Sequence, residues 1–236
     1  EGQPTYPAVA DYVTATERGT VLEYGEWKVS TVEHVLSALY AMGVDNCLIT
    51  LDGPEMPILD GSAKYYIEAI EQVGLQEQDA PQKVYAITEK IEYTSEQGNQ
   101  MLILPCDHYA AQVTICYPSA LLGTQTAQLD DLADYKQQLS LARTFCLVRE
   151  IEPLLRRGLI KGGDLQNALV IYETPMSQDD LDFMTDKLGQ PRLDANQLGY
   201  LSPLNYPNEP ARHKLLDMIG DMSLCGFRLQ AQIVAL

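Results

Sequence analysis

Only three histidines occur in the 236-residue sequence, and two of them stand beside carboxylates in patterns that could bind a metal. His34 directly follows Glu33. His213 precedes Asp217 by four residues, and Asp221 follows four residues after that. Because four residues of an α-helix turn about 400°, the last three side chains form one stripe on a single helix face. That stripe can present an imidazole and a carboxylate to one point in space.

Two imidazoles and one carboxylate, from His34, His213 and Asp217, would give a metal three protein ligands. Zinc sites of this kind keep a fourth position for water and are catalytic, whereas structural zinc sites are closed. Glu33 lies about 100° round the helix from His34, so it can take a proton from the metal-bound water without being a ligand itself. Spacing alone nevertheless favours a simpler interpretation, in which His213 and Asp217 are a stabilising helix pair and His34 is a core or capping histidine.

Helices must position these residues, and the first half of the sequence predicts them by its apolar periodicity. Apolar residues at helical spacing predict an amphipathic helix over about 31–42, which carries Glu33 and His34. A buried strand over 47–53 and a second helix over 63–74 are expected next. His213 and the carboxylates after it belong to a predicted helix over 209–226.

The remaining sequence predicts an α+β arrangement. We expect strands in 84–105, 109–118, 167–173 and 228–236, helices in 131–142 and 150–163, and mostly surface loop from 173 to 209. Residues 76–82 are polar, contain proline and show no periodicity, which suits a linker between domains. Since helices alternate irregularly with strand pairs, the pattern favours an α+β layered fold with domains over 1–78 and 79–236.

Composition and charge restrict the partners and the compartment. The formal net charge of −17 would repel a phosphate backbone, which argues against nucleic acid, although Arg212 and Lys214 could meet a small phosphorylated ligand in a cleft. The five cysteines are odd in number and scattered, so reduced thiols and a cytoplasmic protein are expected. No apolar run approaches the roughly 18 residues of a membrane span. The chain lacks an initiating methionine, so we expect it to be part of a longer protein.

Four sequence strings occur in one order along the chain: STVEHVLSALYAMGVDN, PEMPILDGSA, LARTF and NEPARHKLLDMIGD. Together they resemble the bacterial UDP-3-O-acyl-N-acetylglucosamine deacetylases, whose members remove acetate from an acylated sugar nucleotide in the committed step of lipid A synthesis. The resemblance spans nearly the whole chain and reverses the preference for a simple pair at His213 and Asp217. It implies a metal-dependent amidohydrolase acting on UDP-3-O-(3-hydroxyacyl)-N-acetylglucosamine.

The resemblance also implies roles for the residues that match the family motifs. His34, His213 and Asp217 are expected to bind Zn²⁺, or Fe²⁺, because these ligand types accept both metals. Glu33 matches the general base. Thr144 matches the residue that stabilises the tetrahedral oxyanion beside the metal, although it could simply be a strand hydroxyl.

Three further residues match family positions outside the ligand set. Phe145 should pack against the substrate, and Lys214 should lie near its diphosphate. The simpler alternatives are a core ring and a solvated helix residue. Asp221 should orient a catalytic histidine, the general acid, which the family carries in a Gly-His string beyond the position of Leu236. We therefore expect the metal and the base in this chain, and the acid outside it.

The family fold implied by the resemblance has two domains, each a layered βααβ sandwich, with the active site between them. A βαβ insert in the second domain, at about 146–172, should form a hydrophobic passage for the acyl chain. The candidate wall residues are Leu154, Leu155, Leu159 and Ile160. Packing of the insert on itself explains the same four residues equally well.

The chain departs from the family pattern at both ends. Most of the strand and glycine-containing loop that precede the Arg18–Thr20 string are absent, so the family domain is expected to be truncated at its start as well as its end. The PNEPARHK string and the long loop before it resemble the branch fused to a 3-hydroxyacyl-[acyl-carrier-protein] dehydratase. The alternative function is a non-catalytic sugar-nucleotide or zinc-binding module. Absence of the general-acid histidine from the whole protein would favour this alternative.

Overall fold

The computed structural model describes residues 4–156, 167–187, 189 and 191–236, and its fold is α+β as predicted. The α-helices of these residues are α1 (Glu33–Ala41), α2 (Lys64–Val73), α3 (Tyr135–Gln138), α4 (Val148–Arg156), α5 (Gln178–Lys187) and α6 (Glu209–Ser223). None of the described helices combines the length and apolar character needed to span a bilayer.

The strands of the described residues form three sheets. An antiparallel sheet near the start of the chain contains β1 (Val13–Ala15), β2 (Val21–Tyr24) and β3 (Trp27–Val29). A six-stranded sheet has the order β5-β6-β12-β7-β8, with β4 also paired to β12, and consists of β4 (Val84–Ala86), β5 (Ile91–Thr94), β6 (Gln100–Pro105), β7 (Tyr109–Cys116), β8 (Thr124–Leu129) and β12 (Arg228–Ala235). The third sheet contains β9 (Phe145–Leu147), β10 (Leu169–Tyr172) and β11 (Gly199–Tyr200).

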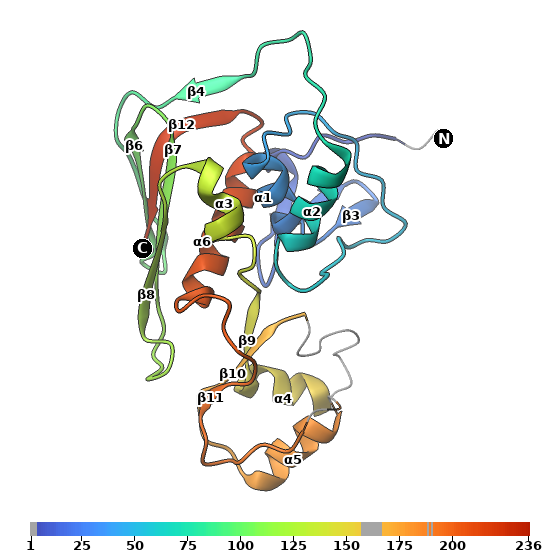
Figure 1. Cartoon of the computed structure of the whole chain (residues 1–236), viewed down its shortest axis with the longest axis vertical. Coiled ribbons are helices and arrows are strands. Elements are labelled where there is room, and N and C mark those ends of the chain that lie inside the picture. Colours follow the sequence, from blue (N-terminus) through green and yellow to red (C-terminus); the bar gives the residue numbers. More distant parts are fainter. Residues whose placement is uncertain (1–3, 157–166, 188, 190) are drawn as a thin grey trace.

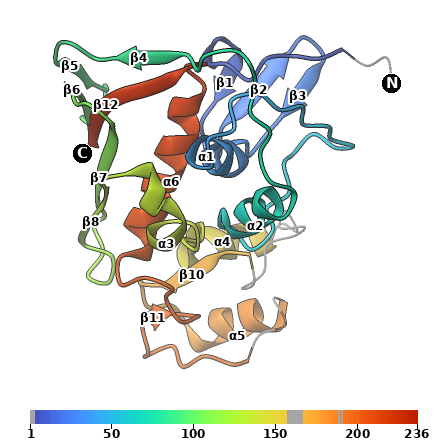
Figure 2. The same cartoon turned by 45° about the horizontal axis from the view of Figure 1, so that its top comes forward.

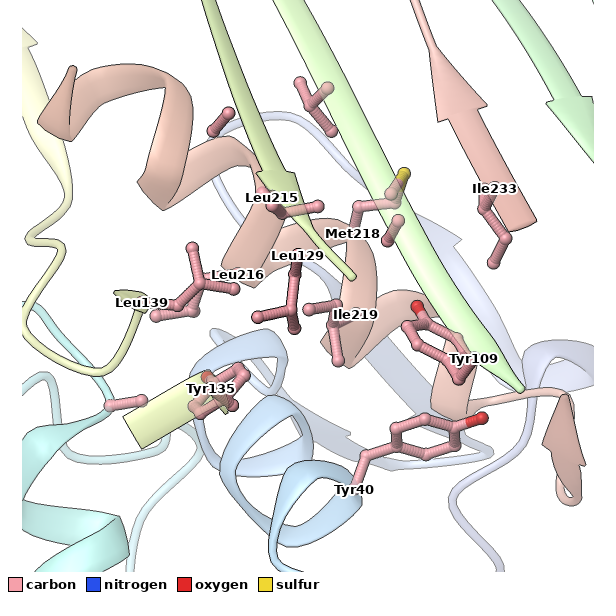
Figure 3. Packing of buried hydrophobic residues seen from close by; sticks show 14 of the residues in the cluster. Tyr40, Tyr109, Leu129, Tyr135, Leu139, Leu215, Leu216, Met218, Ile219 and Ile233 are labelled. Carbon is pink, nitrogen blue, oxygen red and sulfur yellow. The ribbon is translucent and has the colours of Figure 1, made fainter. Parts of the chain in front are cut away.

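The main hydrophobic core lies between α6 and the six-stranded sheet (Figure 1, Figure 3). From α6, Leu215, Leu216 and Ile219 are completely buried, as their helical spacing requires. From the sheet, Leu129 and Ile233 meet them, and alternate residues of β12 are buried in the period of two that a strand imposes. This packing fixes α6, and with it the helix face that carries His213.

Another face of α6 meets α1, and the two helices approach closely at a glycine. A Cβ added at Gly220 would lie 2.0 Å from the carbonyl oxygen of Glu33 and 2.8 Å from its carbonyl carbon. Only glycine permits so close an approach of two backbones. The crossing brings the first turn of α1, with Glu33 and His34, against the face of α6.

We expect Gly220→Ala to lower the free energy of unfolding by about 1–3 kcal/mol, the usual cost of overpacking a core. This loss should appear even though alanine favours an exposed helix over glycine by about 1 kcal/mol. Urea unfolding measures it. Gly199→Ala is the control, since no atom lies within 4 Å of the Cβ it would add. Equal stability of the two variants would contradict the close crossing.

Several regions of the sequence were predicted wrongly. Residues 47–53 form no strand, and Leu48 and Ile49 are 74% and 41% exposed. The apolar run has no paired strand beside it among the described residues, so its backbone forms no ladder. The short strands β1, β2 and β3, which pack on α1 through Leu22 and Val35, were not predicted.

The interval 173–209, predicted as mostly loop, contains α5 and β11. The hydroxyl of Ser177 accepts a hydrogen bond from the backbone N–H of Asp180, which caps the start of α5. Leu181 and Met184, three residues apart, are buried on the helix face that packs against α4. The glycines and prolines of this interval obscured that short apolar pattern. Strand β8 was missed as well, and the helix predicted over 131–142 shortens to a 3₁₀ turn followed by α3.

Strand β9, helix α4 and strand β10 follow one another, and the two strands pair in parallel. With β11 and α5 they lie at the end of the molecule opposite β4 (Figure 1, Figure 2). No helix or strand is assigned between α2 and β4, where the linker was predicted. The division into domains 1–78 and 79–236 stays a prediction.

Candidate functional site

His34, from α1, and His213 and Asp217, from α6, converge on one point. One ligand atom from each residue lies within 4.8 Å of those from the other two. The Nε2 atom of His213 is 3.2 Å from Asp217 Oδ1, and the Nε2 atom of His34 is 3.6 Å from the same oxygen. The two imidazole rings meet edge to face, with centroids 4.9 Å apart and an interplanar angle of 86°.

The carboxylate oxygen at the centre of this group lacks a partner. Asp217 Oδ1 is buried and has no hydrogen-bond partner among the described residues, whereas Asp217 Oδ2 accepts a bond of 2.9 Å from Lys214 Nζ. The Nδ1 atom of the buried His34 also has none. An unpaired buried oxygen is costly unless something satisfies it. Two imidazoles and a carboxylate are donors that zinc accepts, so these residues fit a divalent metal ion.

Burial keeps both imidazoles neutral, which is the state that binds a metal. Burial lowers the pKa of His213 to about 4, and it also lowers the pKa of His34. The Nδ1–H group of His213 donates a hydrogen bond to the carbonyl oxygen of Ala142, and the two heavy atoms are 3.0 Å apart. That bond leaves Nε2 unprotonated and aimed at Asp217. Burial opposes ionisation of Asp217, but the imidazoles and the Lys214 ammonium hold its pKa below the ordinary value.

Glu33 lies beside the ligands on the first turn of α1 and is buried. Burial raises the pKa of its carboxyl to about 7, and the N–H of Thr20, which donates to Oε2 at 2.9 Å, partly opposes this. A carboxyl with a pKa near 7 suits general acid–base chemistry. The Thr20 hydroxyl donates to Asp221 Oδ1 at 2.6 Å, and burial raises the pKa of Asp221 to about 6.

Thr20 therefore joins two carboxylates that were predicted separately, and sequence reasoning had given it no role. It connects Glu33 on α1 to Asp221 on α6 through its backbone and its side chain. The one available signal was its place in the Arg18–Thr20 string. The string alone does not show which carboxylates the threonine meets, since they lie 13 and 201 residues away in the sequence.

Lys214 and Phe145 lie next to each other at the edge of the ligand group. The Lys214 ammonium is 5.6 Å from the centroid of the Phe145 ring, while it also holds Asp217. Tyr117 packs edge to face with the same ring, with centroids 5.9 Å apart. A cation, an aromatic face and a phenol thus stand together beside the ligands, a combination that suits a polar, ring-containing ligand.

Thr144 lies on the segment that reaches His213. Its N–H donates to the carbonyl oxygen of Gly61 at 2.7 Å, and its own carbonyl accepts from Leu169 N at 2.7 Å. Gly61 has φ of +79°, and a Cβ there would lie 2.2 Å from the Asn167 carbonyl oxygen, so this position requires glycine. Of the predicted acyl-passage residues, Leu154 and Leu155 are on α4, while Leu159 and Ile160 lie outside the described residues.

Another group of metal-ligand types, Cys106, Asp107 and His108, occupies the turn between β6 and β7. Asp107 and His108 are exposed and form an ion pair at 2.6 Å, while the Cys106 sulfur lies 3.5 Å from His108 Nδ1. Each side chain already has a partner in this group, and solvent reaches it. It therefore lacks the buried, unpaired donor that marks the group around Asp217.

The fold and the buried donors define an α+β protein with a candidate three-ligand metal centre between two crossing helices. The chain belongs to the family described as LpxC, UDP-3-O-acyl N-acetylglycosamine deacetylase, whose model matches residues 1–188 and 193–236. The family predicted from the four sequence strings is thereby confirmed.

Individual relatives agree with the family match. The chain is 53% identical over 238 residues to a protein of Bacteroides thetaiotaomicron called bifunctional enzyme LpxC/FabZ, with 100% of the chain and 52% of the relative covered. A protein of the same name from Porphyromonas gingivalis is 52% identical, with the same coverage. A Myxococcus xanthus UDP-3-O-acyl-N-acetylglucosamine deacetylase is 35% identical, with 93% of the chain and 63% of the relative covered. The chain thus spans about half the length of the bifunctional relatives.

Proposed function

We propose that this chain carries the metal site and the general base of an enzyme that hydrolyses the N-acetyl group of UDP-3-O-(3-hydroxyacyl)-N-acetylglucosamine, releasing acetate in lipid A biosynthesis. The observation that carries the proposal is the unpaired, buried Oδ1 atom of Asp217, which two neutral imidazoles face. Membership of the deacetylase family and the names of the relatives support the substrate.

In this proposal His34, His213 and Asp217 hold Zn²⁺, or Fe²⁺ where iron is available. The bound metal supplies a Lewis acid that polarises the acetamide carbonyl and makes water more acidic. Glu33 accepts the proton of the attacking water, because it lies beside the ligands without being one of them. Thr144 donates its hydroxyl to the developing oxyanion.

The remaining residues hold the substrate and a second catalytic group. Phe145 packs against the substrate, and Lys214, next to it, attracts the diphosphate. Asp221, already held by Thr20, orients the general acid. The passage for the acyl chain, predicted from the sequence, is assigned to the elements β9, α4 and β10.

We further propose a cytoplasmic protein whose full length includes a dehydratase domain. The five cysteines are free thiols, which supports a reducing compartment. The bifunctional names of the Bacteroides thetaiotaomicron and Porphyromonas gingivalis relatives, and the half of their length that the chain covers, support the fused domain.

Metal analysis and acetate release test the proposed function. The full-length protein should contain one tightly held zinc or iron and release acetate from the acylated UDP-sugar. Removal of the metal with a chelator should reduce acetate release to background, and added Zn²⁺ should restore it. Tight metal and sugar-nucleotide binding with no acetate release would instead support the non-catalytic binding module.

A further inference from the structure

A buried ion pair joins the segment before β9 to the start of α6, close to the ligands but outside their group. Glu209 lies in the first turn of α6, four residues before His213, and its side chain is 0% exposed. Arg143 Nε donates to Glu209 Oε1 at 2.8 Å, and Arg143 Nη2 donates to Oε2 at 3.2 Å. This two-bond geometry fixes the orientation of both side chains.

The same carboxylate also holds backbone. Glu209 Oε1 accepts the backbone N–H of Arg143 at 3.1 Å, and Oε2 accepts the N–H of Asn205 at 2.7 Å. The free side of the guanidinium donates to Ser202 Oγ at 3.1 Å and to the Pro203 carbonyl at 2.7 Å. Every polar group of this buried pair therefore has a partner, and the carboxylate controls the position of the Arg143 peptide itself.

That peptide stands between two groups of the candidate site. The carbonyl of Ala142, on one side of Arg143, accepts the Nδ1 proton of His213 at 3.0 Å. Thr144, on the other side, is held by Gly61. Glu209 thus connects the Ala142–Thr144 segment, which supports the His213 ring, to the first turn of α6, one turn before His213. Any shift of this short segment along α6 would turn the imidazole and move Thr144 together.

We propose that the Arg143–Glu209 pair is a positioning device that sets the orientation of the metal ligand His213 and the place of Thr144. The inference rests on the proposed function, because it assigns the pair to that metal site. Groups that hold the second nitrogen of a ligating histidine commonly affect metal affinity by about 10- to 100-fold. Here that group is the backbone carbonyl of Ala142, and the Arg143–Glu209 pair holds the segment that carries it.

A second pair in the same chain provides a matched control. Arg149 and Glu173 are joined at 2.5 Å, and the Glu173 side chain is 3% exposed. Their contacts lie on α4 and after β10, with no bond to a ligand or its support among the described residues. Both glutamates are buried and paired with arginine, but only Glu209 connects to His213. Glutamine at each position removes the charge and keeps the shape.

The test measures Zn²⁺ affinity of the full chain by competition with a chromophoric chelator, and the visible spectrum of the Co²⁺-loaded chain. We expect Glu209→Gln to weaken Zn²⁺ binding by about 10- to 100-fold and to alter the Co²⁺ spectrum. Arg143→Lys keeps the charge but loses the two-bond geometry, and should weaken Zn²⁺ binding by roughly 3- to 10-fold. Glu173→Gln should bind both metals as the unchanged protein does.

If Glu209→Gln does not fold, as judged by circular dichroism, Arg143→Lys decides the question. Wild-type Zn²⁺ affinity and an unchanged Co²⁺ spectrum in the folded variants, with only a lower urea midpoint, would show a purely structural pair and overturn this inference alone. An unmodified chain that binds no Zn²⁺ would overturn the proposed function and the inference with it.

Discussion

Replacing His213 with alanine should remove tight zinc binding and nearly all acetate release. The substitution deletes one of three ligands and leaves Asp217 Oδ1 and His34 with an incomplete donor set. The loss of zinc affinity should exceed the roughly 100-fold that outer-shell changes produce. Without the Lewis acid, acetate release should fall by about 10³-fold or more, which corresponds to about 4 kcal/mol.

The third histidine gives this experiment its control. His108 belongs to the exposed group with Cys106 and Asp107, which offers ligand types similar to those around Asp217. His108→Ala should retain the tight zinc and the acetate release of the unchanged full-length protein. Zinc content is measured by elemental analysis after dialysis, and acetate by a coupled assay. Zinc that disappears from His108→Ala and stays in His213→Ala would place the metal on the β6–β7 turn instead.

The helices that carry the site were predictable because their apolar spacing is local information. Residues 31–42 and 209–226 were predicted as helices, and α1 and α6 occupy them. The strand predicted over 47–53 was wrong because strand formation depends on non-local pairing: an apolar run becomes a strand only when another strand pairs with it. In the part of the chain that the structure describes, none does.

The candidate site likewise contains residues that local sequence patterns predicted and residues that they did not. Four-residue spacing placed His213 and Asp217 on one helix face, His34 was the candidate third ligand on another helix, and the family resemblance favoured this metal site over a simple helix pair. Spacing could not show that Gly220 lets α1 approach α6, which is what brings those residues together. Thr20 and Glu209 contribute through contacts with distant segments, so no local pattern marks them. Sequence reasoning thus found the groups with recognisable chemistry and missed those that hold them.

Replacing Glu33 with glutamine should separate proton transfer from metal binding. The amide keeps the size of the side chain and can still accept the Thr20 N–H, so α1 and the ligand group should stay in place. It cannot take a proton at neutral pH. Because a positioned general base contributes about 10²- to 10⁴-fold, acetate release should fall by that factor while zinc content and zinc affinity stay unchanged.

The matched control for this loss is Glu55→Gln, which makes the same chemical change on a neighbouring loop. Glu55 is exposed and lies outside the ligand group, and it accepts a hydrogen bond at 2.9 Å from the hydroxyl of Thr31, which is two residues before Glu33. Its substitution should leave kcat and zinc affinity as they were. A Glu33→Gln enzyme with unchanged kcat would remove this carboxylate as the base. One that lost its zinc together with its activity would show instead that Glu33 supports the ligands, because a base that only moves a proton has no effect on how tightly the metal is held.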